Sequence, residues 1–163
     1  MDGKKEVRVG IGWDLHPFGE GRPLVLGGIR IPYERGLVGH SDADVVIHAL
    51  CDALLGALSL GDLGTLYPSS DPRYEGISST FFLREVMGRV SEKGYRVSHV
   101  DLVIIAQGPK LAPFIENMRE RLSKEMGVDK DCVSVKAKSP EGVGAIGRGE
   151  GISAIAVALL EKG

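Results

Sequence analysis

Three side chains, Asp14, His16 and His48, are the strongest candidates for metal chemistry in this sequence. Asp14 and His16 are separated by one residue and follow a short apolar run, and residues two apart in an extended segment project to the same side. Both can therefore bind one ion, with His48 as a third ligand. Two imidazole nitrogens and one carboxylate suit zinc and leave its fourth position open, as catalysis requires. The Asp-x-His spacing is common, so it is also compatible with hydrogen-bonded, partly buried histidines.

Further polar residues near these three could serve the same chemistry. Asp44 and Asp52 each lie four residues from His48 and share its helical face, so either could orient the imidazole through its other nitrogen. Asp44 also fits the cap of a helix. His40 can change its charge near neutral pH and could contact a phosphate or act on a proton, although a loop histidine is also compatible with a plain surface group.

A second set of candidates is associated with glycines. Asp62 and Glu141 stand beside glycines, where backbone can approach a ligand closely, and their carboxylates could hold a hard cation such as magnesium on a diphosphate. Residues 106–110 end a strand and open a helix, which directs backbone N–H groups and one Lys toward an anion, although an ordinary turn has the same pattern. Residues 147–151 alternate glycine with opposite charges and fit a tight turn with an Arg–Glu pair.

The order of apolar patterns predicts an α+β domain. Strands are expected at residues 7–11, 24–26, 29–31, 97–106, 133–137 and 152–160. Helices are expected over about four turns from Ser41 to near Gly61, over 80–93 and over 111–126, with loops at 61–79 and 142–151. We therefore predict a mixed β-sheet with helices packed on one face, a ferredoxin-like two-layer sandwich. The small residues Ala154, Ala156 and Ala158 could let the last strand pack against another chain.

Composition narrows the class of protein. The 163 residues suffice for a single domain, 1–163, with its own core. The 20 basic and 22 acidic residues nearly cancel without a basic run, so nucleic acid is not an expected partner. Neither a signal peptide nor an apolar run of membrane-spanning length is visible, so no membrane partner is expected. Cys51 and Cys132 lie far apart, as in a reduced, cytoplasmic protein.

Short stretches in a fixed order add a family resemblance to these patterns. They are residues 12–16 (GWDLH), 28–33 (GIRIPY), 40–45 (HSDADV), 52–57 (DALLGA), 61–64 (GDLG), 104–107 (IIAQ) and 147–151 (GRGEG). Each stretch is only moderately specific, but their joint occurrence in this order is not expected by chance. From near Val9 to near Leu160 the chain resembles the 2-C-methyl-D-erythritol 2,4-cyclodiphosphate synthases.

The resemblance implies an enzyme of the non-mevalonate route to isoprenoids and terpenoids. It would be a phosphorus-oxygen lyase and a homotrimer with active sites at subunit interfaces. The substrate would be 4-diphosphocytidyl-2-C-methyl-D-erythritol 2-phosphate, whose 2-phosphate attacks its own β-phosphorus, releases CMP and closes 2-C-methyl-D-erythritol 2,4-cyclodiphosphate. Zinc would be held by Asp14, His16 and His48, and Mg²⁺ or Mn²⁺ on the diphosphate by Glu141.

The resemblance also assigns substrate contacts. His40 and Ser41 would position the diphosphate and the methylerythritol part, with His40 and Ser139 among the catalytic residues. The cytidine pocket would be formed by Ala106, Gln107, Gly108, Pro109, Lys110 and Leu111. Further contacts would come from Asp62, Gly64, Ala137, Lys138, Ser139 and Arg148.

Three positions depart from the family pattern, and two other functions fit the same ligands. Residues 138–140 read Lys-Ser-Pro where threonines commonly precede the glutamate, Ser69 stands where an aspartate often contacts the sugar alcohol, and Ala145 replaces an aromatic residue lining a central apolar cavity that holds isoprenoid diphosphates in relatives. One alternative is a zinc-dependent phosphohydrolase that splits a nucleotide diphosphate with metal-bound water. The other is a non-catalytic trimer that binds a nucleotide.

Overall fold

A computed structural model describes residues 3–163 as a sheet covered by helices on one side. The strands are β1 (Val7–Gly19), β2 (Leu24–Leu26), β3 (Ile29–Ile31), β4 (Gly36–Leu37), β5 (Tyr95–Ile105), β6 (Val133–Lys138) and β7 (Gly151–Lys162). The helices are α1 (Val45–Ala57), α2 (Leu63–Leu66), α3 (Ser79–Glu92), α4 (Ile115–Met126) and α5 (Gly144–Gly147).

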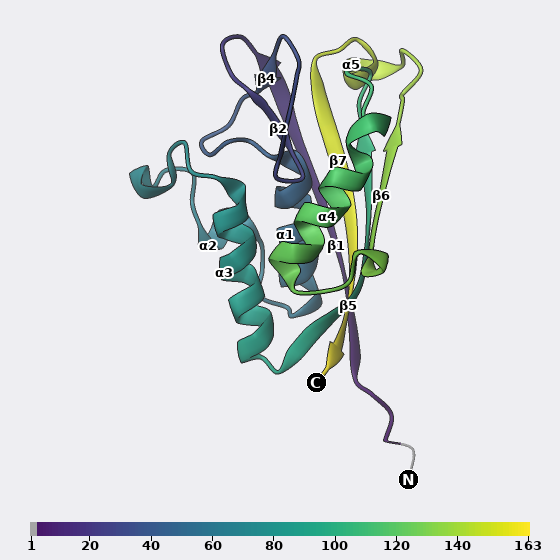
Figure 1. The fold of residues 1–163 in the computed structure, drawn as a ribbon. Helices are drawn as coiled ribbons and strands as arrows, with labels where there is room; N and C mark the ends of the chain where they lie inside the picture. The colour runs from purple at the N-terminus through teal and green to yellow at the C-terminus, as the bar shows by residue number, and fades with distance from the viewer. Residues whose placement is uncertain (1–2) are drawn as a thin grey trace.

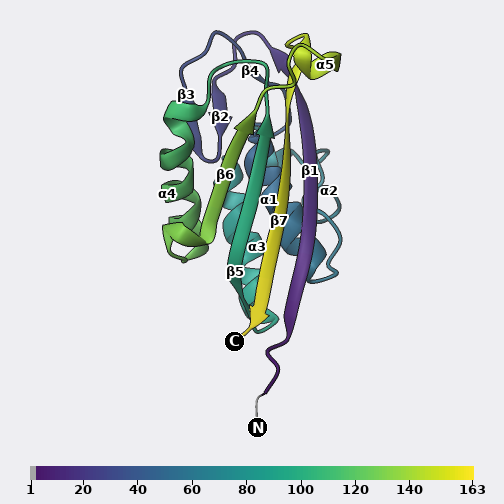
Figure 2. The same cartoon turned by 90° about the vertical axis from the view of Figure 1, so that its right-hand side faces the viewer.

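The main sheet has the strand order β4-β1-β7-β5-β6. β5 and β6 run parallel, whereas β1 and β5 are both antiparallel to β7, which lies between them (Figure 2). β2 and β3 form the separate hairpin that the glycine turn predicted. The predicted mixed sheet is confirmed.

The helical layer lies on one face of this sheet, as predicted (Figure 1). α1 packs on β1 and β7, α3 packs beside α1, and α4 packs on β6. Because nearly every side chain of α1 is buried, this helix forms the centre of the core. It also carries His48, so a deeply buried helix positions a candidate ligand.

β1 is much longer than the expected strand at residues 7–11, because it pairs with β7 from Val7 to Pro17. Asp14 and His16 therefore lie inside the strand rather than after it. The sequence hides this because the helix-facing positions hold glycines and polar residues instead of an apolar alternation. The expected strand captured only the first part of β1.

α1 approaches β1 at two glycines. A Cβ at Gly10 would lie 1.9 Å from the carbonyl oxygen of Ala53, and one at Gly12 would lie 1.9 Å from that of Ala49. No side chain fits there, so the two backbones are in direct contact. Ala154, Ala156 and Ala158 of β7 are also fully buried inside the chain, where α1 packs on their strand. The expectation that these alanines contact another chain is wrong.

The other helix boundaries differ modestly from the predicted ones. α1 ends at Ala57 rather than near Gly61, and α4 begins at Ile115 because a 3-10 turn with Pro113 precedes it. The expected loop at 61–79 contains the short α2 and a 3-10 turn. The expected loop at 142–151 contains α5.

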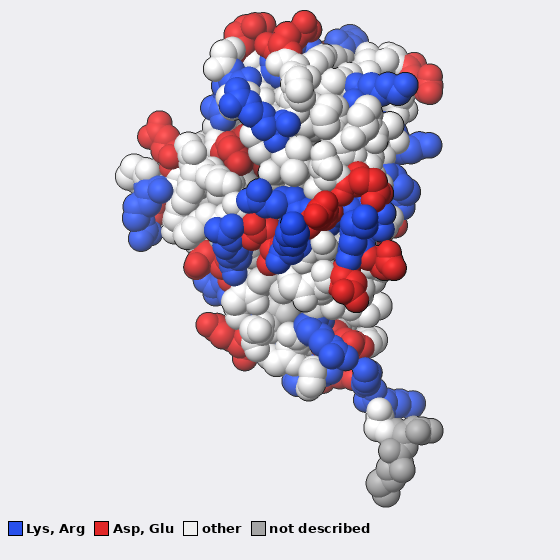
Figure 3. Space-filling view, viewed as in Figure 1, with Lys and Arg blue, Asp and Glu red and all other residues white. Residues whose placement is uncertain are grey.

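The two faces of the sheet differ in chemistry. Away from the helices, β1 exposes a row of large apolar side chains, including Val9, Ile11 and Trp13, which are 67%, 71% and 60% exposed. Leu15 on β1 and Val157 and Leu159 on β7 extend this exposed apolar face. On the helical side, Figure 3 shows basic and acidic side chains interleaved, many of them in ion pairs such as Arg84 with Glu125.

Within residues 3–163 no helix has the length and apolar character needed to cross a bilayer.

Candidate metal and substrate site

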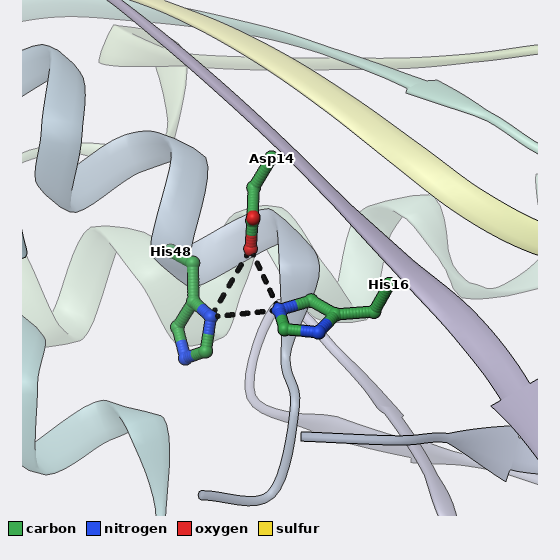
Figure 4. A group of neighbouring side chains, drawn as sticks. All are labelled: Asp14, His16 and His48. Atoms are coloured by element: carbon green, nitrogen blue, oxygen red, sulfur yellow. Dashed lines mark hydrogen bonds and ion pairs between the residues drawn. The ribbon is translucent and has the colours of Figure 1, made fainter. Parts of the chain in front are cut away.

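Asp14, His16 and His48 converge between β1 and α1 (Figure 4). The Asp14 Oδ2 atom lies 2.8 Å from His16 Nε2 and 3.1 Å from His48 Nδ1, and the two ring nitrogens are 3.2 Å apart. Asp14 and His16 meet because both lie on the helix-facing side of β1, while His48 projects from the first turns of α1. No other trio of such side chains close enough to share an ion occurs in the described part of the chain.

The three atoms fit a small tetrahedral cation. Zinc bonds of about 2.0–2.2 Å to nitrogen and oxygen place neighbouring ligand atoms about 3.3 Å apart. The three separations here are only slightly shorter, so small side-chain movements accommodate an ion. The donor set, two imidazoles and a carboxylate, is also the composition of open catalytic zinc sites.

Hydrogen bonds outside the cluster orient both rings. His16 Nδ1 lies 3.0 Å from the carbonyl oxygen of Val38, which can only accept, so Nδ1 is the donor, and a neutral ring has its Nε2 lone pair available for a cation in the cluster. His48 Nε2 lies 2.9 Å from the Ser79 hydroxyl and 3.2 Å from that of Ser41. Each histidine therefore presents one nitrogen inward and has a partner for the other.

Electrostatics keep the cluster ready for a cation. Burial favours a raised pKa at Asp14, but the hydrogen bonds and charges of His16 and His48 outweigh it, and its pKa lies well below the usual value. At His16 burial acts to lower the pKa, yet the hydrogen bond and charge of Asp14 dominate and raise it. An ionised carboxylate beside two imidazoles is the charge distribution that a divalent ion would complete.

The prediction that Asp44 or Asp52 orients the His48 ring is wrong. The Asp44 carboxylate accepts from the backbone N–H groups of Gly27, Gly28 and Ile47, so it caps α1, as expected, and clamps the β2–β3 turn to it. The Asp52 carboxylate accepts from the backbone N–H of Leu63. Asp44 and Asp52 thus fix backbone segments instead of the imidazole.

A cavity of about 330 Å³ opens beside the cluster. Its polar lining includes the three candidate ligands, His40 and Ser41, and the rest of the lining includes Tyr67, Tyr74, Phe82 and the segment 68–70. The aromatic rings contact one another, with centroids of Tyr67 and Phe82 5.3 Å apart. The cavity therefore combines a polar end with an apolar wall, as small-molecule sites do.

The predicted contacts on the N-terminal half fall in or near this cavity. His40, Ser41, Gly64 and Ser69 line it. His40 Nε2 donates to the carbonyl oxygen of Asp71 at 2.7 Å, which leaves its Nδ1 as an acceptor. Asp62 does not line the cavity; its carboxylate caps α2 by accepting from the N–H of Thr65, and hydrogen bonds from the side chain and then the backbone of Thr65 lower the pKa of Asp62. The carboxylate of Asp71, two residues after Ser69, is paired with Arg73.

The predicted nucleotide contacts form a separate group at the ends of β5 and β6. Because these strands are parallel, residues 106–111 and 139–142 leave the sheet at the same edge. The Gln107 side chain accepts from the N–H of Gly142 at 2.9 Å, and the Ser139 hydroxyl accepts from the N–H of Glu141 at 3.1 Å. This Gln107–Gly142 pair joins the two segments, which we call the nucleotide loops.

Most of the nucleotide loops are open to solvent. Gln107, Lys110, Ala137, Lys138, Ser139 and Glu141 are exposed, Gly108 and Pro109 are half-buried, and Ala106 and Leu111 are buried. Glu141 has a left-handed backbone (φ 54°), which turns the chain there. Arg148, at the end of α5, pairs with Glu150 in the tight turn that the sequence suggested. The lining of the cavity includes none of these residues.

Sequence reasoning missed two kinds of residue at this site. Asp42 and Ser79 form hydrogen bonds that reach His48, and Tyr67, Tyr74 and Phe82 form the apolar wall. Ser79 lies 31 residues from His48 on a different helix, so no local spacing connects them. The aromatic residues had no visible periodicity because two of them lie in an irregular segment.

Together the fold and the cluster define a mixed α+β protein with three side chains beside a cavity that could hold a metal ion. The chain belongs to the YgbB family, whose model matches residues 7–161. It is 56% identical over 154 residues to the 2-C-methyl-D-erythritol 2,4-cyclodiphosphate synthase of Moorella thermoacetica, covering 94% of both chains, and 52% identical over 156 residues to that of Geobacter metallireducens, covering 96% and 99%. The resemblance drawn from the short stretches is confirmed.

Solved structures agree with these relatives. A 2C-methyl-D-erythritol-2,4-cyclodiphosphate synthase in its CDP-bound form matches with a TM-score of 0.86 and 42% identity, covering 94% of this chain and 99% of that one. A Plasmodium falciparum protein in complex with CDP matches with a TM-score of 0.85 and 33% identity, covering 99% and 100%. The match is full-length in each case.

Proposed function

We propose that this chain converts 4-diphosphocytidyl-2-C-methyl-D-erythritol 2-phosphate into 2-C-methyl-D-erythritol 2,4-cyclodiphosphate and CMP. The observation that carries the proposal is the convergence of Asp14, His16 and His48 beside a cavity, in a chain more than half identical to synthases of that name. An oxygen of the 2-phosphate forms a bond to the β-phosphorus, and the bond from that phosphorus to the oxygen bridging to the α-phosphorus breaks. CMP leaves with that oxygen, and no water is consumed.

Asp14, His16 and His48 would hold zinc, and Glu141 would hold a second divalent ion, Mg²⁺ or Mn²⁺, on the diphosphate. When bound, these cations polarise the β-phosphate and offset negative charge on the departing CMP. The choice of zinc is supported by the donor set and the short separations between its atoms.

The other cavity residues would fold the substrate for in-line attack. Nucleophile and electrophile belong to one molecule, so holding them in the reactive geometry supplies much of the catalysis. His40, whose Nε2 is occupied by the Asp71 carbonyl, has Nδ1 left for substrate, and Ser41 lies beside it. The wall of Tyr67, Tyr74 and Phe82 would pack the carbon skeleton and exclude water, which disfavours hydrolysis.

The nucleotide half of the site would come from a neighbouring chain in a homotrimer. Two observations support this: the cavity is lined without any contribution from the nucleotide loops, and the outer face of β1 and β7 is strongly apolar. A contiguous exposed apolar face is typical of an interface. In this arrangement Lys110, Ser139 and Glu141 of one chain would complete the cavity of the next. Each chain would act as a single domain, 1–163.

Product analysis tests the reaction. The purified chain, supplied with Zn²⁺ and Mg²⁺, is incubated with the cytidine substrate and followed by phosphorus NMR, with metal content measured on the same sample. We expect equimolar CMP and cyclic diphosphate, with zinc near one per chain. Formation of two open-chain phosphates instead would identify a zinc-dependent phosphohydrolase, and binding without turnover would identify a non-catalytic protein.

Mixing two inactive variants tests the shared site. His48→Ala disables the metal half of the site, which consists of Asp14, His16 and His48. Glu141→Ala disables the nucleotide half, which consists of the nucleotide loops. If each site combines one half from each of two neighbours, randomly mixed trimers contain an intact pair at about a quarter of their sites. Co-refolded variants should therefore regain about a quarter of the wild-type activity. If the mixture stays inactive while it forms trimers, the two halves belong to the same chain.

A further inference from the structure

His48 is connected to the half-buried carboxylate of Asp42 through one hydroxyl group. Ser79, the first residue of α3, is fully buried, and its Oγ lies 2.9 Å from His48 Nε2. The same hydroxyl donates to Asp42 Oδ1. Asp42 Oδ2 accepts from the backbone N–H of Ser79 at 3.1 Å, so the carboxylate holds both polar groups of this serine.

The direction of these bonds follows from what each group can donate. An ionised carboxylate only accepts, and a serine hydroxyl has a single proton. The Ser79 proton is therefore directed to Asp42, and the lone pairs of Ser79 Oγ face the imidazole. A proton on His48 Nε2 satisfies one of these lone pairs and leaves Nδ1, the atom facing Asp14 and His16, unprotonated in the neutral ring. The Asp14 carboxylate, 3.1 Å from Nδ1, can only accept and favours the opposite tautomer until a cation occupies the cluster.

We propose that Ser79 and Asp42 are positioning residues that hold His48 in the Nε2–H tautomer and fix its ring so that the Nδ1 lone pair is directed at the metal. The inference rests on the proposed function in taking zinc as the ion that Nδ1 binds. It adds a carboxylate–hydroxyl–imidazole relay that joins the start of α3 to a ligand on α1. His16 needs no relay, since the Val38 carbonyl serves the same purpose directly.

Ser41 is the competing partner of the same nitrogen. Its Oγ is more distant, at 3.2 Å from His48 Nε2, and it accepts from the N–H of Ala43 at 3.3 Å. Were Ser41 the donor to Nε2, the ring proton would have to move to Nδ1, which would block the lone pair that faces the cluster. The two arrangements predict opposite tautomers, so they can be separated by experiment.

The first measurement is the affinity of the full-length chain for zinc, by competition with a chelator. Outer-shell partners of a metal-bound histidine typically contribute 10- to 100-fold, so Ser79→Ala should weaken zinc binding by about that factor. Ser78→Ala is the matched control: Ser78 is the exposed N-cap of the same helix, accepts from Thr80 and does not contact His48. Its zinc affinity should equal that of the wild type. Ser41→Ala should also retain most of it.

The second measurement reads the tautomer directly. Nitrogen-15 NMR is recorded on the metal-free Asp14→Ala chain, in which no carboxylate faces Nδ1. It should show the Nε2–H form of His48, and a mixture of tautomers once Ser79→Ala is added. An Asp14→Ala spectrum dominated by the Nδ1–H form would overturn the relay. Equal zinc affinity in Ser79→Ala and Ser78→Ala would overturn it too. Neither readout requires turnover, so a chain that releases no CMP would refute the proposed function and leave the relay decided separately.

Discussion

The candidate metal ligands and the nucleotide loops contrast in how far one chain arranges them. Asp14, His16 and His48 come from a strand and a helix in direct backbone contact, and their ligand atoms lie within 4.8 Å of one another. Lys110, Ser139 and Glu141 lie on exposed connections beyond the ends of two strands, outside the cavity. The candidate metal ligands are brought together within one chain, whereas the nucleotide loops of the same chain lie apart from them on exposed connections.

The contrast shows where each half obtains its precision. Regular elements fix side chains through the packing of the core, so the cost of ordering the ligands is met during folding. Exposed loops become ordered only when a ligand or partner binds, so their loss of conformational entropy occurs at that step. We therefore expect changes in the metal half to alter metal binding or stability, and changes in the nucleotide loops to alter turnover alone.

Loss of a ligand should give the largest effect. His48→Ala removes one of three zinc-binding atoms, and because outer-shell partners alone contribute 10- to 100-fold, we expect activity to fall by about 10³-fold or more. Metal analysis after gel filtration should find no zinc. Retention of full zinc and activity would refute the ligand assignment and, with it, the distinction between the two halves.

The contact between β1 and α1 can be broken at Gly12. Gly12→Ala places a Cβ against the backbone of α1, where nothing can move aside, so the free energy of unfolding should fall by about 3 kcal/mol or more. Zinc affinity should fall with it. Urea unfolding provides the measurement.

Gly56→Ala, on the exposed side of α1, is the matched control for that substitution. The nearest atom to its added Cβ is the Ile11 carbonyl oxygen at 3.8 Å, an ordinary contact. Alanine is also the better helix former, so this variant should gain about 1 kcal/mol. If Gly12→Ala left the free energy of unfolding and the zinc affinity unchanged, the close packing of β1 and α1 would not be what positions the metal half.

The nucleotide half should respond in the opposite way. Glu141→Ala should leave zinc content and stability unchanged, because the side chain is exposed, and should slow CMP release by about 100-fold through loss of charge stabilisation in the transition state. Steady-state kinetics beside metal analysis checks both parts. Glu120→Ala, an exposed glutamate on α4, serves as the control. Loss of zinc in Glu141→Ala would show that the metal half and the nucleotide half are not independent of each other.

The smallest effect concerns pH. Burial and the charge of Asp42 raise the pKa of Asp44 to about 6, above the 3.8 of a free aspartate. The contribution of this group to stability is therefore complete below about pH 4 and is lost as the pH rises through 6, when the folded chain must ionise a buried carboxyl. Relative to Asp44→Asn, the metal-free wild type should lose about 2 kcal/mol across this interval. Urea unfolding at several pH values would contradict this if both proteins followed the same profile.

Much of the fold could be predicted from sequence because its signals are local. The Leu24–Ile31 hairpin, the capped helix at Asp44 and the strand at 97–106 each rest on neighbouring residues, and all three are present. The second half of β1 was not predicted, because glycines and the candidate metal ligands occupy its helix-facing positions in place of apolar residues. Ala154, Ala156 and Ala158 were assigned to the wrong neighbour, since a stripe of small residues does not reveal which element approaches it.

The site divides in the same manner. Asp14 and His16 could be paired by strand spacing, His48 was available as a third ligand, and the family resemblance assigned all three to one zinc ion. The Ser79–Asp42 connection could not be predicted, because it depends on how the start of α3 packs against α1. Long-range polar contacts of this kind carry no periodic pattern.

The parallel pairing of β5 and β6 has a mechanical consequence. Both strands deliver their following segments to one rim of the sheet, and the Gln107 side chain ties one segment to the other. Because β5 and β6 are hydrogen-bonded along their length, a shift of one strand along its axis would move both nucleotide loops. The segments that carry Gln107 and Glu141 are therefore held in a fixed relative position by one strand pairing and one side-chain hydrogen bond.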